Sequence, residues 1–469
     1  MDLKAYARMF EEAEKDFESA MGKYGVPFEE AESSPRSERG RMGRRGCHCE
    51  NGGSSIWRNW ISPACLACRT GEGTGSVFVD LRCTKNCYFC FNANQPHYDH
   101  FRSHERDIVL ELEQAHAAGA AYRFLAITGG EPLLHEDRVI AFLERAAQRY
   151  PEAHKRLYTN GDLLTERGLA RLADSGLTEI RFSVKPLDAD DRQEHVYAMM
   201  EKAAAVLPDV VVEVPVIPGS LEEMKGLVRR ADGLGVRGIN LLEFCFPLCN
   251  AEEFLKRGLA LRKRPYRFLY DYWYRGGVPV AQSEREALAL LEFADREDLR
   301  IGMHYCSADN RNAGQVNLQD KAFEAKRDVR RVYPWIERDG DDYFLKCAKA
   351  FGDDVAPVKE WAESAAAPCH VNAGVPSIAF PLDLVPAVRK ACPTVALGMS
   401  ANVLEEQADG SFCMREVGVE ELPSPAPPAR GLPRAITGQG GGRTPAAHPR
   451  VARNGRFRVQ KRPFRATAR

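Results

Sequence analysis

Between about residues 76 and 245, short apolar runs alternate with longer segments in which apolar residues recur at helical spacing. Six runs have the length and composition of buried strands: Val77–Leu81, Phe124–Thr128, Arg156–Tyr158, Ile180–Ser183, Val210–Val216 and Gly238–Glu243. The helical segments between them are Ile108–Ala118, Arg138–Arg149, Glu166–Asp174, Glu194–Val206 and Leu221–Leu234. Repeated strand–helix units predict an α/β fold, with a parallel sheet, helices outside it and all strand carboxyl ends on one face.

The segments before this core have weaker patterns. Residues 1 to about 34 predict a leading helix, in which Phe10, Phe17 and Met21 recur at roughly helical spacing. The stretch that follows, SSPRSERGRMGRRG, is polar, basic and contains glycine. We expect it to form a solvated loop.

The segments after the core begin with one more helix–strand unit, which the helical pattern of Glu284–Ala294 and the apolar run Leu299–Cys306 predict. Residues 321–420 combine an aromatic, hairpin-like stretch at Val332–Phe344 with a helix-plus-strand pattern. After Leu422 the chain is rich in proline, glycine, alanine and arginine, which predicts a disordered tail.

These changes of pattern divide the chain into five predicted parts. They are an N-terminal helix and cysteine-containing extension (1–75), the strand–helix core (76–245), an extension with candidate metal ligands (246–320), a small α+β region (321–421) and a disordered basic tail (422–469).

The composition is ordinary for a soluble globular protein, with 28% charged and 44% hydrophobic residues in a chain of 469. No apolar run approaches the roughly 20 residues that a membrane span needs. The N-terminus has no basic segment followed by an apolar one, as a signal peptide would. We therefore expect a cytoplasmic protein without a membrane partner.

The formal net charge of -1 conceals an asymmetry. The tail after Glu421 has 11 Lys and Arg and no Asp or Glu, so the rest of the chain has 54 basic and 66 acidic residues, or about -12. A body this acidic offers no general surface for nucleic acid, and we do not expect nucleic acid as a partner. Weak RNA binding through the tail and the basic stretch before residue 46 stays open as an alternative.

Three cysteines follow the first predicted strand at once: Cys83, Cys87 and Cys90, in a C-x₃-C-x₂-C spacing. Three thiolates on one short loop can hold an iron–sulfur cluster, and because four-iron clusters normally have four thiolate ligands, one iron would stay open. They could instead form part of a zinc site, which would need a fourth ligand. Loops after strands on this face of a barrel carry its chemistry, which favours the cluster.

The second predicted strand ends in Gly129-Gly130-Glu131-Pro132. Glycines let the backbone approach a ligand closely. Such a sequence is a common turn by itself, but here it ends the strand that follows the cysteine loop.

The cysteine spacing, with Phe89 just before the last cysteine, and the Gly-Gly-Glu-Pro element together resemble the radical S-adenosylmethionine (radical SAM) enzymes. The resemblance implies a partial (β/α)6 barrel of the TIM type, here with N- and C-terminal extensions. It implies a [4Fe-4S] cluster on the three cysteines with SAM on the open iron. It also implies reductive cleavage of SAM to a 5′-deoxyadenosyl radical, which abstracts hydrogen from a protein, peptide or small-molecule substrate, and a reducing partner such as ferredoxin or flavodoxin.

The resemblance also implies which residues contact SAM. Gly129, Gly130 and Glu131 would meet its amino group, and Phe89 would pack near adenine. Three further candidates follow the third and fourth predicted strands: Asn160, Ser183 and Lys185. For Asn160, simple turn chemistry with Gly161 is the alternative, and for Lys185 it is exposure to solvent.

A second group of cysteines predicts an auxiliary metal site. Cys65 and Cys68 form a C-x₂-C pair that can present two thiolates to one metal, and Cys306 ends the additional strand. A second iron–sulfur cluster, a zinc ion or plain free thiols all fit; Cys47, Cys49 and His304 could take part. The C-x₂-C pair and the His-Tyr-Cys-Ser element resemble an uncharacterised, mainly archaeal group related to the pyruvate formate-lyase activating enzyme.

The remaining scattered cysteines predict free thiols: Cys347, Cys369, Cys392 and Cys413. The residues alone leave two alternatives to a radical SAM enzyme acting on a protein, peptide or small molecule. One is an RNA-modifying enzyme of the same superfamily. The other is a non-catalytic zinc or iron–sulfur protein.

Overall fold

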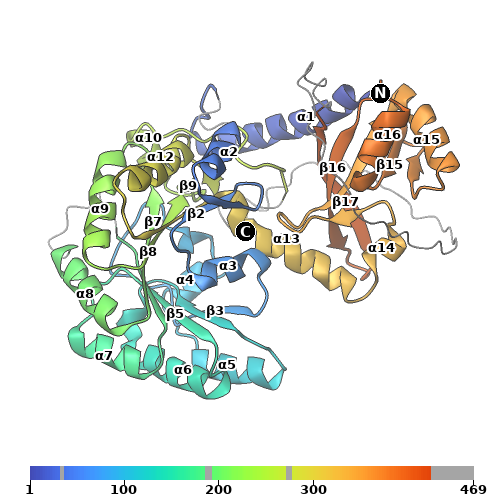
Figure 1. Ribbon diagram of the computed structural model, residues 1–469. Helices are drawn as coiled ribbons and strands as arrows, with labels where there is room; N and C mark the ends of the chain where they lie inside the picture. The colour runs from blue at the N-terminus through green and yellow to red at the C-terminus, as the bar shows by residue number, and fades with distance from the viewer. Residues whose placement is uncertain (32–35, 185–192, 271–276, 424–469) are drawn as a thin grey trace, which may run out of the picture. The chain divides into compact units, whose positions relative to one another are not determined.

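The computed structural model describes residues 1–31, 36–184, 193–270 and 277–423 (Figure 1). They form two compact units. The larger contains residues 12–321 and 339–343, and the smaller contains residues 1–11, 322–338 and 344–423. Lys185 and the basic tail from residue 424, on which the RNA alternative depends, lie outside the described residues.

The larger unit is built on a nine-stranded sheet in the order β1-β2-β11-β8-β7-β6-β5-β4-β3. Its strands are β1 (His48–Glu50), β2 (Ser55–Arg58), β3 (Thr74–Phe78), β4 (Phe124–Thr128), β5 (His154–Thr159), β6 (Glu179–Phe182), β7 (Asp209–Val216), β8 (Gly238–Glu243) and β11 (Gly302–Cys306). Strands β3 to β8 pair in parallel in chain order, β11 adds in parallel beside β8, and β2 closes that edge antiparallel to β11. The predicted α/β fold of six strand–helix units is confirmed, and the additional predicted strand joins the same sheet.

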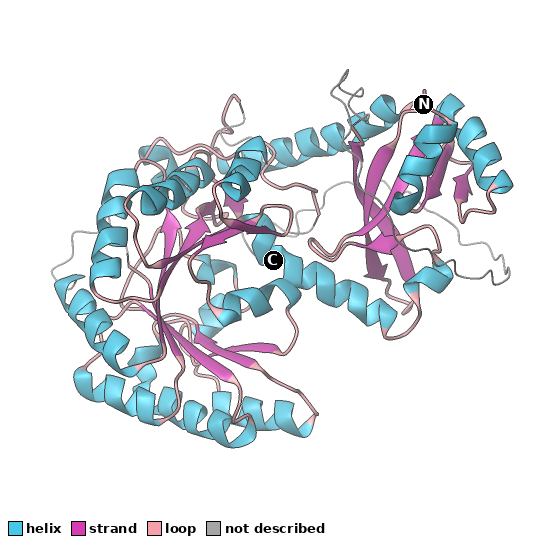
Figure 2. Ribbon diagram, viewed as in Figure 1, coloured by secondary structure: helices cyan, strands magenta, loops and turns pink. Residues whose placement is uncertain are grey.

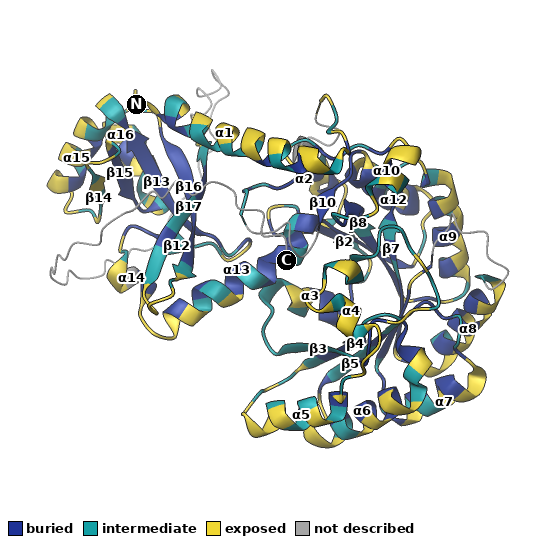
Figure 3. Ribbon diagram, turned by 180° about the vertical axis from the view of Figure 1, so that it is seen from behind, coloured by how far each residue is buried: buried dark blue, intermediate teal, exposed yellow. Residues whose placement is uncertain are grey.

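Helices lie along the outer side of this sheet (Figure 2). They are α5 (Ile108–Ala117), α6 (Glu136–Arg149), α7 (Glu166–Asp174), α8 (Gln193–Val206), α9 (Leu221–Gly233) and α12 (Ser283–Arg296). In α6, Val139, Leu143 and Ala146 are buried at helical spacing, so one face packs on the sheet. Figure 3 shows the strands as buried and the outer faces of these helices as exposed. Burial on both faces explains why the central strands are nearly continuous apolar runs.

The inner face of the parallel strands also carries buried charges. Arg181 of β6 pairs with Glu179 on its own strand and with Glu213 of β7 at 2.5 Å. Asn240 of β8 donates to the same carboxylate of Glu213 at 3.0 Å. Buried charges are tolerated when they are paired and hydrogen-bonded, and here one arginine serves two glutamates.

The first strand of the core lies three residues before its predicted position. The sequence predicts Val77–Leu81, whereas β3 spans Thr74–Phe78. Val79 and Leu81 are still buried, at 1% and 3% exposure, but their backbones bond to residues outside the sheet: Val79 O accepts from Arg106 N, and Leu81 N donates to Phe101 O. The apolar residues therefore predicted burial correctly. The strand ends earlier than predicted because the backbone of these residues bonds outside the sheet.

The prediction of a solvated loop after residue 32 is wrong for residues 36–44, which form helix α2 (Arg36–Arg44). Met42 is buried at 2% exposure and Arg39 at 5%. The Arg39 guanidinium binds both carboxylate oxygens of Glu284 and donates to Ser54 Oγ at 3.0 Å. A helix held by one buried arginine and one methionine has too few apolar residues to be recognised from its pattern.

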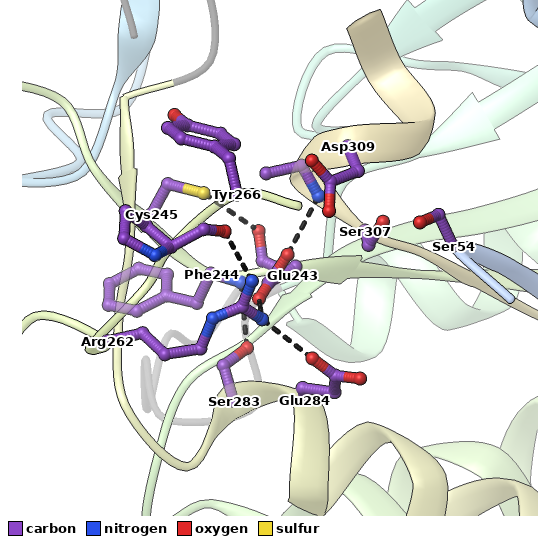
Figure 4. A network of polar contacts seen from close by, with 12 residues as sticks. Ser54, Glu243, Phe244, Cys245, Arg262, Tyr266, Ser283, Glu284, Ser307 and Asp309 are labelled. Carbon is purple, nitrogen blue, oxygen red and sulfur yellow. Dashed lines mark hydrogen bonds and ion pairs between the residues drawn. The ribbon is translucent and has the colours of Figure 1, made fainter. Parts of the chain in front are cut away.

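Glu284, the partner of Arg39, belongs to a buried ion network that reaches the sheet, and Figure 4 shows the part of it around Arg262. Arg262 lies between two carboxylates, that of Glu243 at the end of β8 and that of Glu284 in α12, the latter at 2.6 Å. The second oxygen of Glu243 accepts from the backbone N–H of Ala308, at the start of α13 (Ala308–Glu324), at 2.8 Å. Two arginines and two glutamates thus fix α2, α12 and α13 to the end of one strand.

The remaining described elements of the larger unit lie around the ends of the strands. They are most of α1 (Leu3–Met21), η1 (Gly22–Tyr24), α3 (Pro63–Thr70), η2 (Phe91–Asn94), α4 (Tyr98–Phe101), η3 (Pro132–His135), β9 (Cys245–Phe246), α10 (Ala251–Lys256) and β10 (Val278–Pro279). The predicted leading helix is present as α1, with Phe17 and Met21 buried. Helix α3 has ordinary end signals: Ser62 accepts the N–H of Ala64, and Gly71 ends the helix in a left-handed conformation.

The smaller unit has its own sheet, in the order β14-β15-β13-β16-β17, with β12 beside β13. Its elements are α14 (Val329–Val332), β12 (Glu337–Arg338), β13 (Leu345–Phe351), η4 (Gly352–Asp354), α15 (Val355–Ser364), β14 (His370–Asn372), β15 (Ser377–Phe380), η5 (Leu382–Leu384), α16 (Val385–Ala391), β16 (Gly398–Glu406) and β17 (Phe412–Glu421). The predicted hairpin-like stretch Val332–Phe344 contains β12, but the strand that pairs with β12, β13, begins just after it at Leu345. Lys349 and Glu416 form a buried ion pair in this sheet.

Among the described residues, every helix is too short or too polar to cross a lipid bilayer.

We expect Glu284→Gln to lower the free energy of unfolding by about 3 kcal/mol, because Arg39 and Arg262 would lose a shared buried counter-ion. Urea denaturation measures the change. Glu292→Gln on the same helix is the matched control: its pair with Arg45 is partly exposed, and the expected change is within about 0.5 kcal/mol. Equal effects of the two substitutions would contradict a stabilising role for the network.

Candidate active site

The cysteine loop begins where β3 leaves the sheet. Asp80 is buried, and its Oδ1 accepts the backbone N–H of Arg82 at 3.1 Å, which turns the chain away from the strand. The loop then carries Cys83, Cys87 and Cys90, and the N–H of Cys90 donates to the carbonyl of Cys87 at 3.1 Å. A buried carboxylate therefore sets the direction in which the three cysteines leave the sheet.

Two asparagines fix the far side of this loop, in η2. Asn92 Nδ2 donates to the carbonyl of Gly129 at 2.7 Å, and Asn94 Nδ2 donates to the carbonyl of Pro247 at 2.6 Å. The loop is thus tied to the ends of two strands, β4 and β9.

The Gly-Gly-Glu segment touches the cysteine loop backbone to backbone. Gly130 N donates to the carbonyl of Asp80 at 3.2 Å, and Glu131 N donates to that of Arg82 at 2.7 Å. A Cβ at Gly130 would overlap the carbonyl of Arg82. Gly129 has φ +117°, and a Cβ there would lie 2.7 Å from the carbonyl oxygen of Asp80. Both positions therefore require glycine.

The carboxylate of Glu131 is buried at 1% exposure and accepts three hydrogen bonds. The donors are Thr159 Oγ1 at 2.7 Å and the backbone N–H groups of Asn160 at 2.7 Å and Leu133 at 3.1 Å. Burial raises the pKa of Glu131, and these donors oppose the shift. The side chain therefore links the end of β4 to the end of β5, and its contact with the SAM amino group stays a prediction.

Asn160 lies against the cysteine loop. Its Nδ2 donates to Thr84 Oγ1 at 2.8 Å and approaches Cys83 Sγ at 3.8 Å, while its Oδ1 accepts the N–H of Asp162 at 3.0 Å. The asparagine therefore makes the turn contact weighed above and also reaches the loop. Hydrogen bonds to cluster ligands are one of the features that set the reduction potential of an iron–sulfur centre.

These segments border a cavity of about 280 Å³. It brings together nearly all of the predicted cluster and SAM residues: Cys83, Cys87, Phe89, Cys90, Gly129, Gly130, Glu131, Asn160 and Ser183. Phe89 contacts Phe244 edge-on, with ring centroids 5.4 Å apart, and forms an aromatic wall. Lys185 lies outside the described residues, so its role stays a prediction.

Other residues of this cavity were not predicted as site residues. They include Lys85, Arg181, Glu213, Glu243, Cys245 and Arg311. Arg311 Nη2 donates to Cys245 Sγ at 2.9 Å. Burial raises the pKa of Cys245 to about 11, so this thiol is neutral at ordinary pH. An arginine in the first turns of a helix is usually solvated. The one sequence signal that could have placed Arg311 in the site is that its helix follows directly after a predicted strand.

The thiols of the predicted auxiliary site lie on α3 and at the end of β11. Arg181 Nη2 donates to Cys65 Sγ at 3.3 Å, and Asn310 Nδ2 donates to Cys306 Sγ at 3.3 Å. Burial raises the pKa of Cys306 to about 12, and the nearby thiols of Cys68 and Cys65 act in the same direction. Two of the three thiols are buried, while Cys68 is exposed.

The spacing of these sulfur atoms does not match a closed zinc site. Zn–S bonds of about 2.3 Å in a tetrahedron place the sulfurs about 3.8 Å apart. Within the described part of the chain, no three atoms from these cysteines, Cys47, Cys49 and His304 lie within 4.8 Å of one another. His304 is buried, its Nε2 lies 3.0 Å from Ser55 Oγ, and its Nδ1 has no hydrogen-bond partner among the described residues. The auxiliary site stays a prediction.

Comparison with known proteins decides the family. Residues 81–231 match the family model described as the radical SAM superfamily, and this range begins just before the cysteine loop and includes Gly129–Glu131. Residues 81–231 are therefore a radical SAM domain. The relatives of the chain are enzymes, so the interpretation as a radical SAM enzyme with a [4Fe-4S] cluster and SAM as cofactors is confirmed. The donor set fits that cluster, because three thiols line one cavity beside the Gly-Gly backbone.

Two relatives have named activities. A protein of Methanocaldococcus jannaschii, provisionally named a glycyl-radical enzyme activating enzyme, is 28% identical over 311 residues, which are 65% of this chain and 77% of the relative. A GTP 3′,8-cyclase of Corynebacterium glutamicum is 29% identical over 242 residues, which are 48% of this chain and 58% of the cyclase.

The chain spans about half the length of the solved structures that it resembles. The crystal structure of Streptococcus suis SuiB bound to the precursor peptide SuiA has a TM-score of 0.37 and 15% identity, over 50% of this chain and 48% of SuiB. The structure of BtrN in complex with AdoMet and 2-DOIA has a TM-score of 0.25 and 24% identity, over 30% of this chain and 56% of BtrN.

We expect Gly130→Ala to weaken SAM binding by about tenfold or more, because its Cβ cannot fit against the carbonyl of Arg82 and overpacking costs about 1–3 kcal/mol. Equilibrium dialysis of the reconstituted protein with labelled SAM, together with iron analysis, measures the loss.

The matched control for that substitution is Gly226→Ala in α9, where an added Cβ meets nothing within 4 Å. It should leave SAM binding unchanged and stabilise the helix by about 0.5–1 kcal/mol. Wild-type SAM affinity in Gly130→Ala would show that the backbone contact does not shape the site.

Proposed function

We propose that this protein abstracts a hydrogen atom from a carbon of a protein, peptide or small-molecule substrate, as a radical SAM enzyme. The observation that carries the proposal is the convergence of three thiols, the Gly-Gly backbone and Asn160 on one cavity at the carboxyl ends of parallel strands. Ligand sites in such sheets lie at this face, where loops from several strands meet.

Each group around the cavity has a role in this proposal. Cys83, Cys87 and Cys90 would hold the cluster and leave one iron open for SAM. When bound, the cluster and SAM supply a 5′-deoxyadenosyl radical by reductive cleavage of SAM. Gly129 and Gly130 present peptide groups that no side chain covers. The wall formed by Phe89 and Phe244 excludes water from the reacting centre, which protects reactive intermediates.

Asn160 and Glu131 act as positioning residues. Glu131 accepts the backbone N–H of Asn160, and the Asn160 side chain reaches Thr84 and Cys83 in the cysteine loop. The end of β5 is therefore fixed against the loop. Members of the superfamily need a reductant, and we propose a small electron carrier such as ferredoxin or flavodoxin.

The two named relatives suggest two substrate classes. The archaeal relative is named for activating a glycyl-radical enzyme, which favours a glycine in a partner polypeptide. The cyclase relative is named for GTP, which favours a charged small molecule. We propose a cytoplasmic location, because a reducing compartment keeps the cysteines of a metal-binding loop available as thiolate ligands.

We also propose that Cys65, Cys68 and Cys306 hold an auxiliary metal centre. The proposal is supported by the approach of three thiols from two elements and by the orphaned Nδ1 of the buried His304 nearby in β11. The wide sulfur spacing favours an iron–sulfur cluster over a zinc ion.

Anaerobic reconstitution with iron and sulfide, followed by dithionite and SAM, should yield 5′-deoxyadenosine from the wild type. The triple variant Cys83→Ala, Cys87→Ala, Cys90→Ala should yield none above background, because no ligand for the cluster would remain on the loop. Cys392→Ala in the smaller unit is the control and should retain full activity. A wild type with a full cluster that forms no 5′-deoxyadenosine contradicts the proposed chemistry.

Metal analysis of the same triple variant tests the auxiliary centre. We expect iron to remain bound, and adding Cys65→Ala and Cys68→Ala should remove it. If the triple variant binds zinc and not iron, the auxiliary site holds zinc. If it binds neither metal, the proposed auxiliary site is wrong.

A further inference from the structure

Arg311 borders the active-site cavity at the carboxyl end of β8. It lies in α13 and donates through Nη2 to the carbonyl of Glu243, the last residue of β8, at 3.3 Å. Its guanidinium carbon lies 5.9 Å from the centre of the ring of Phe91, the residue that follows Cys90. A substrate that occupies the cavity between SAM and this strand end would therefore meet the guanidinium of Arg311.

The guanidinium of Arg311 has more donors than partners. Of its five N–H bonds, those on Nη2 serve the thiol of Cys245 and the carbonyl of Glu243. Its Nε is buried without a hydrogen-bond partner among the described residues. Within the same residues, no carboxylate forms an ion pair with it. A cation in this position is costly unless a counter-ion joins it in the working complex.

The other charges of the cavity already have partners. Arg181 is paired with Glu179 and Glu213, and Lys85 is paired with Asp162 at 3.2 Å. The nearest candidate for Arg311, the carboxylate of Glu243, is engaged by Arg262 and by the N–H of Ala308 (Figure 4). Among the described cations of this cavity, Arg311 is thus the one available to an incoming anion.

A second cavity, of about 610 Å³, also has Arg311 in its wall. Its other lining groups come from α13 and the end of α3, and they include Asn312, Gln315 and Leu318. Arg311 therefore lines both cavities.

We propose that Arg311 binds an oxyanion of the substrate, a carboxylate or a phosphate group, and so places the reacting carbon between itself and SAM. This inference rests on the proposed function and adds the substrate class. The planar guanidinium is suited to either anion, because its parallel N–H bonds can grip two oxygens at once. Cys245, held by the same guanidinium, would then lie beside the bound anion.

The test uses the full-length reconstituted protein with saturating SAM. The SAM site is then filled, and an added anion is not competing with the carboxylate of SAM for it. Inorganic phosphate and succinate are the probes, and neutral succinamide is the control ligand. Wild type, Arg311→Gln and Arg311→Lys are compared by thermal midpoint and by equilibrium dialysis with labelled probe. The matched protein control is Arg229→Gln in α9, whose arginine is exposed and pairs with Glu297.

We expect phosphate or succinate to bind and raise the thermal midpoint of the wild type and of Arg229→Gln, with no effect of succinamide. Arg311→Gln should weaken that binding by about tenfold or more, and Arg311→Lys should recover part of it. Binding of phosphate alone assigns a phosphorylated substrate, and binding of succinate alone assigns a carboxylate. The midpoints without anion establish that each variant is folded.

Two results overturn the inference: no probe binds the wild type, or the probes bind Arg311→Gln as well as the wild type. A third result does so too: Arg311→Gln loses SAM affinity tenfold, because the guanidinium would then serve the carboxylate of SAM. Failure of the proposed function looks different. In that case the wild type forms no 5′-deoxyadenosine, while anion binding still depends on Arg311.

Discussion

The backbone of the cysteine loop and the backbone after β4 touch where no side chain fits. Two hydrogen bonds join Asp80 and Arg82 to Gly130 and Glu131, and any Cβ at Gly130 would overlap a carbonyl oxygen. This contact brings the thiols of one loop and the bare peptide groups of another to a common cavity. The rest of the barrel supports it: buried Asp80 directs the first loop, and buried Glu131 fixes the second to the end of β5.

Three buried arginines of the larger unit are paired with glutamates, and among the described residues Arg311 has no such partner. Arg181, Arg262 and Arg39 are each buried and each neutralised by glutamates from neighbouring elements. Arg311 departs from this pattern, because its partners are a thiol and a carbonyl. Among the described cations of the cavity it therefore differs from Arg181 and Lys85, which have carboxylate partners.

The sequence was sufficient for the core of the fold, because buried parallel strands and amphipathic helices leave periodic patterns. Strands β4 and β8 and helix α7 have the predicted bounds. The cysteine spacing and the Gly-Gly-Glu-Pro element predicted the cofactors, since both are contiguous in the chain. What failed depends on distant partners. Helix α2 has little apolar character and is held by Glu284, and the end of β3 is set by the backbone of residues 101 and 106.

The same distinction explains what the sequence analysis missed in the site. The contact of Glu131 with SAM stays a prediction, but its hydrogen bonds from Thr159 and Asn160 could not be inferred from the motif in which it lies. Arg311 was not predicted as a site residue, because its neighbours follow β8, far earlier in the chain. Neither set of partners can be inferred from spacing alone.

Helix α2 also has a consequence for the order in which the molecule is made. Glu284, which holds Arg39, follows it by 245 residues. At a synthesis rate of about 5–20 residues per second, roughly 10–50 s pass on the ribosome before the partner of Arg39 emerges. The basic segment around residue 40 therefore leaves the ribosome well before Glu284, and it docks only after the whole parallel sheet up to β8 has been synthesised.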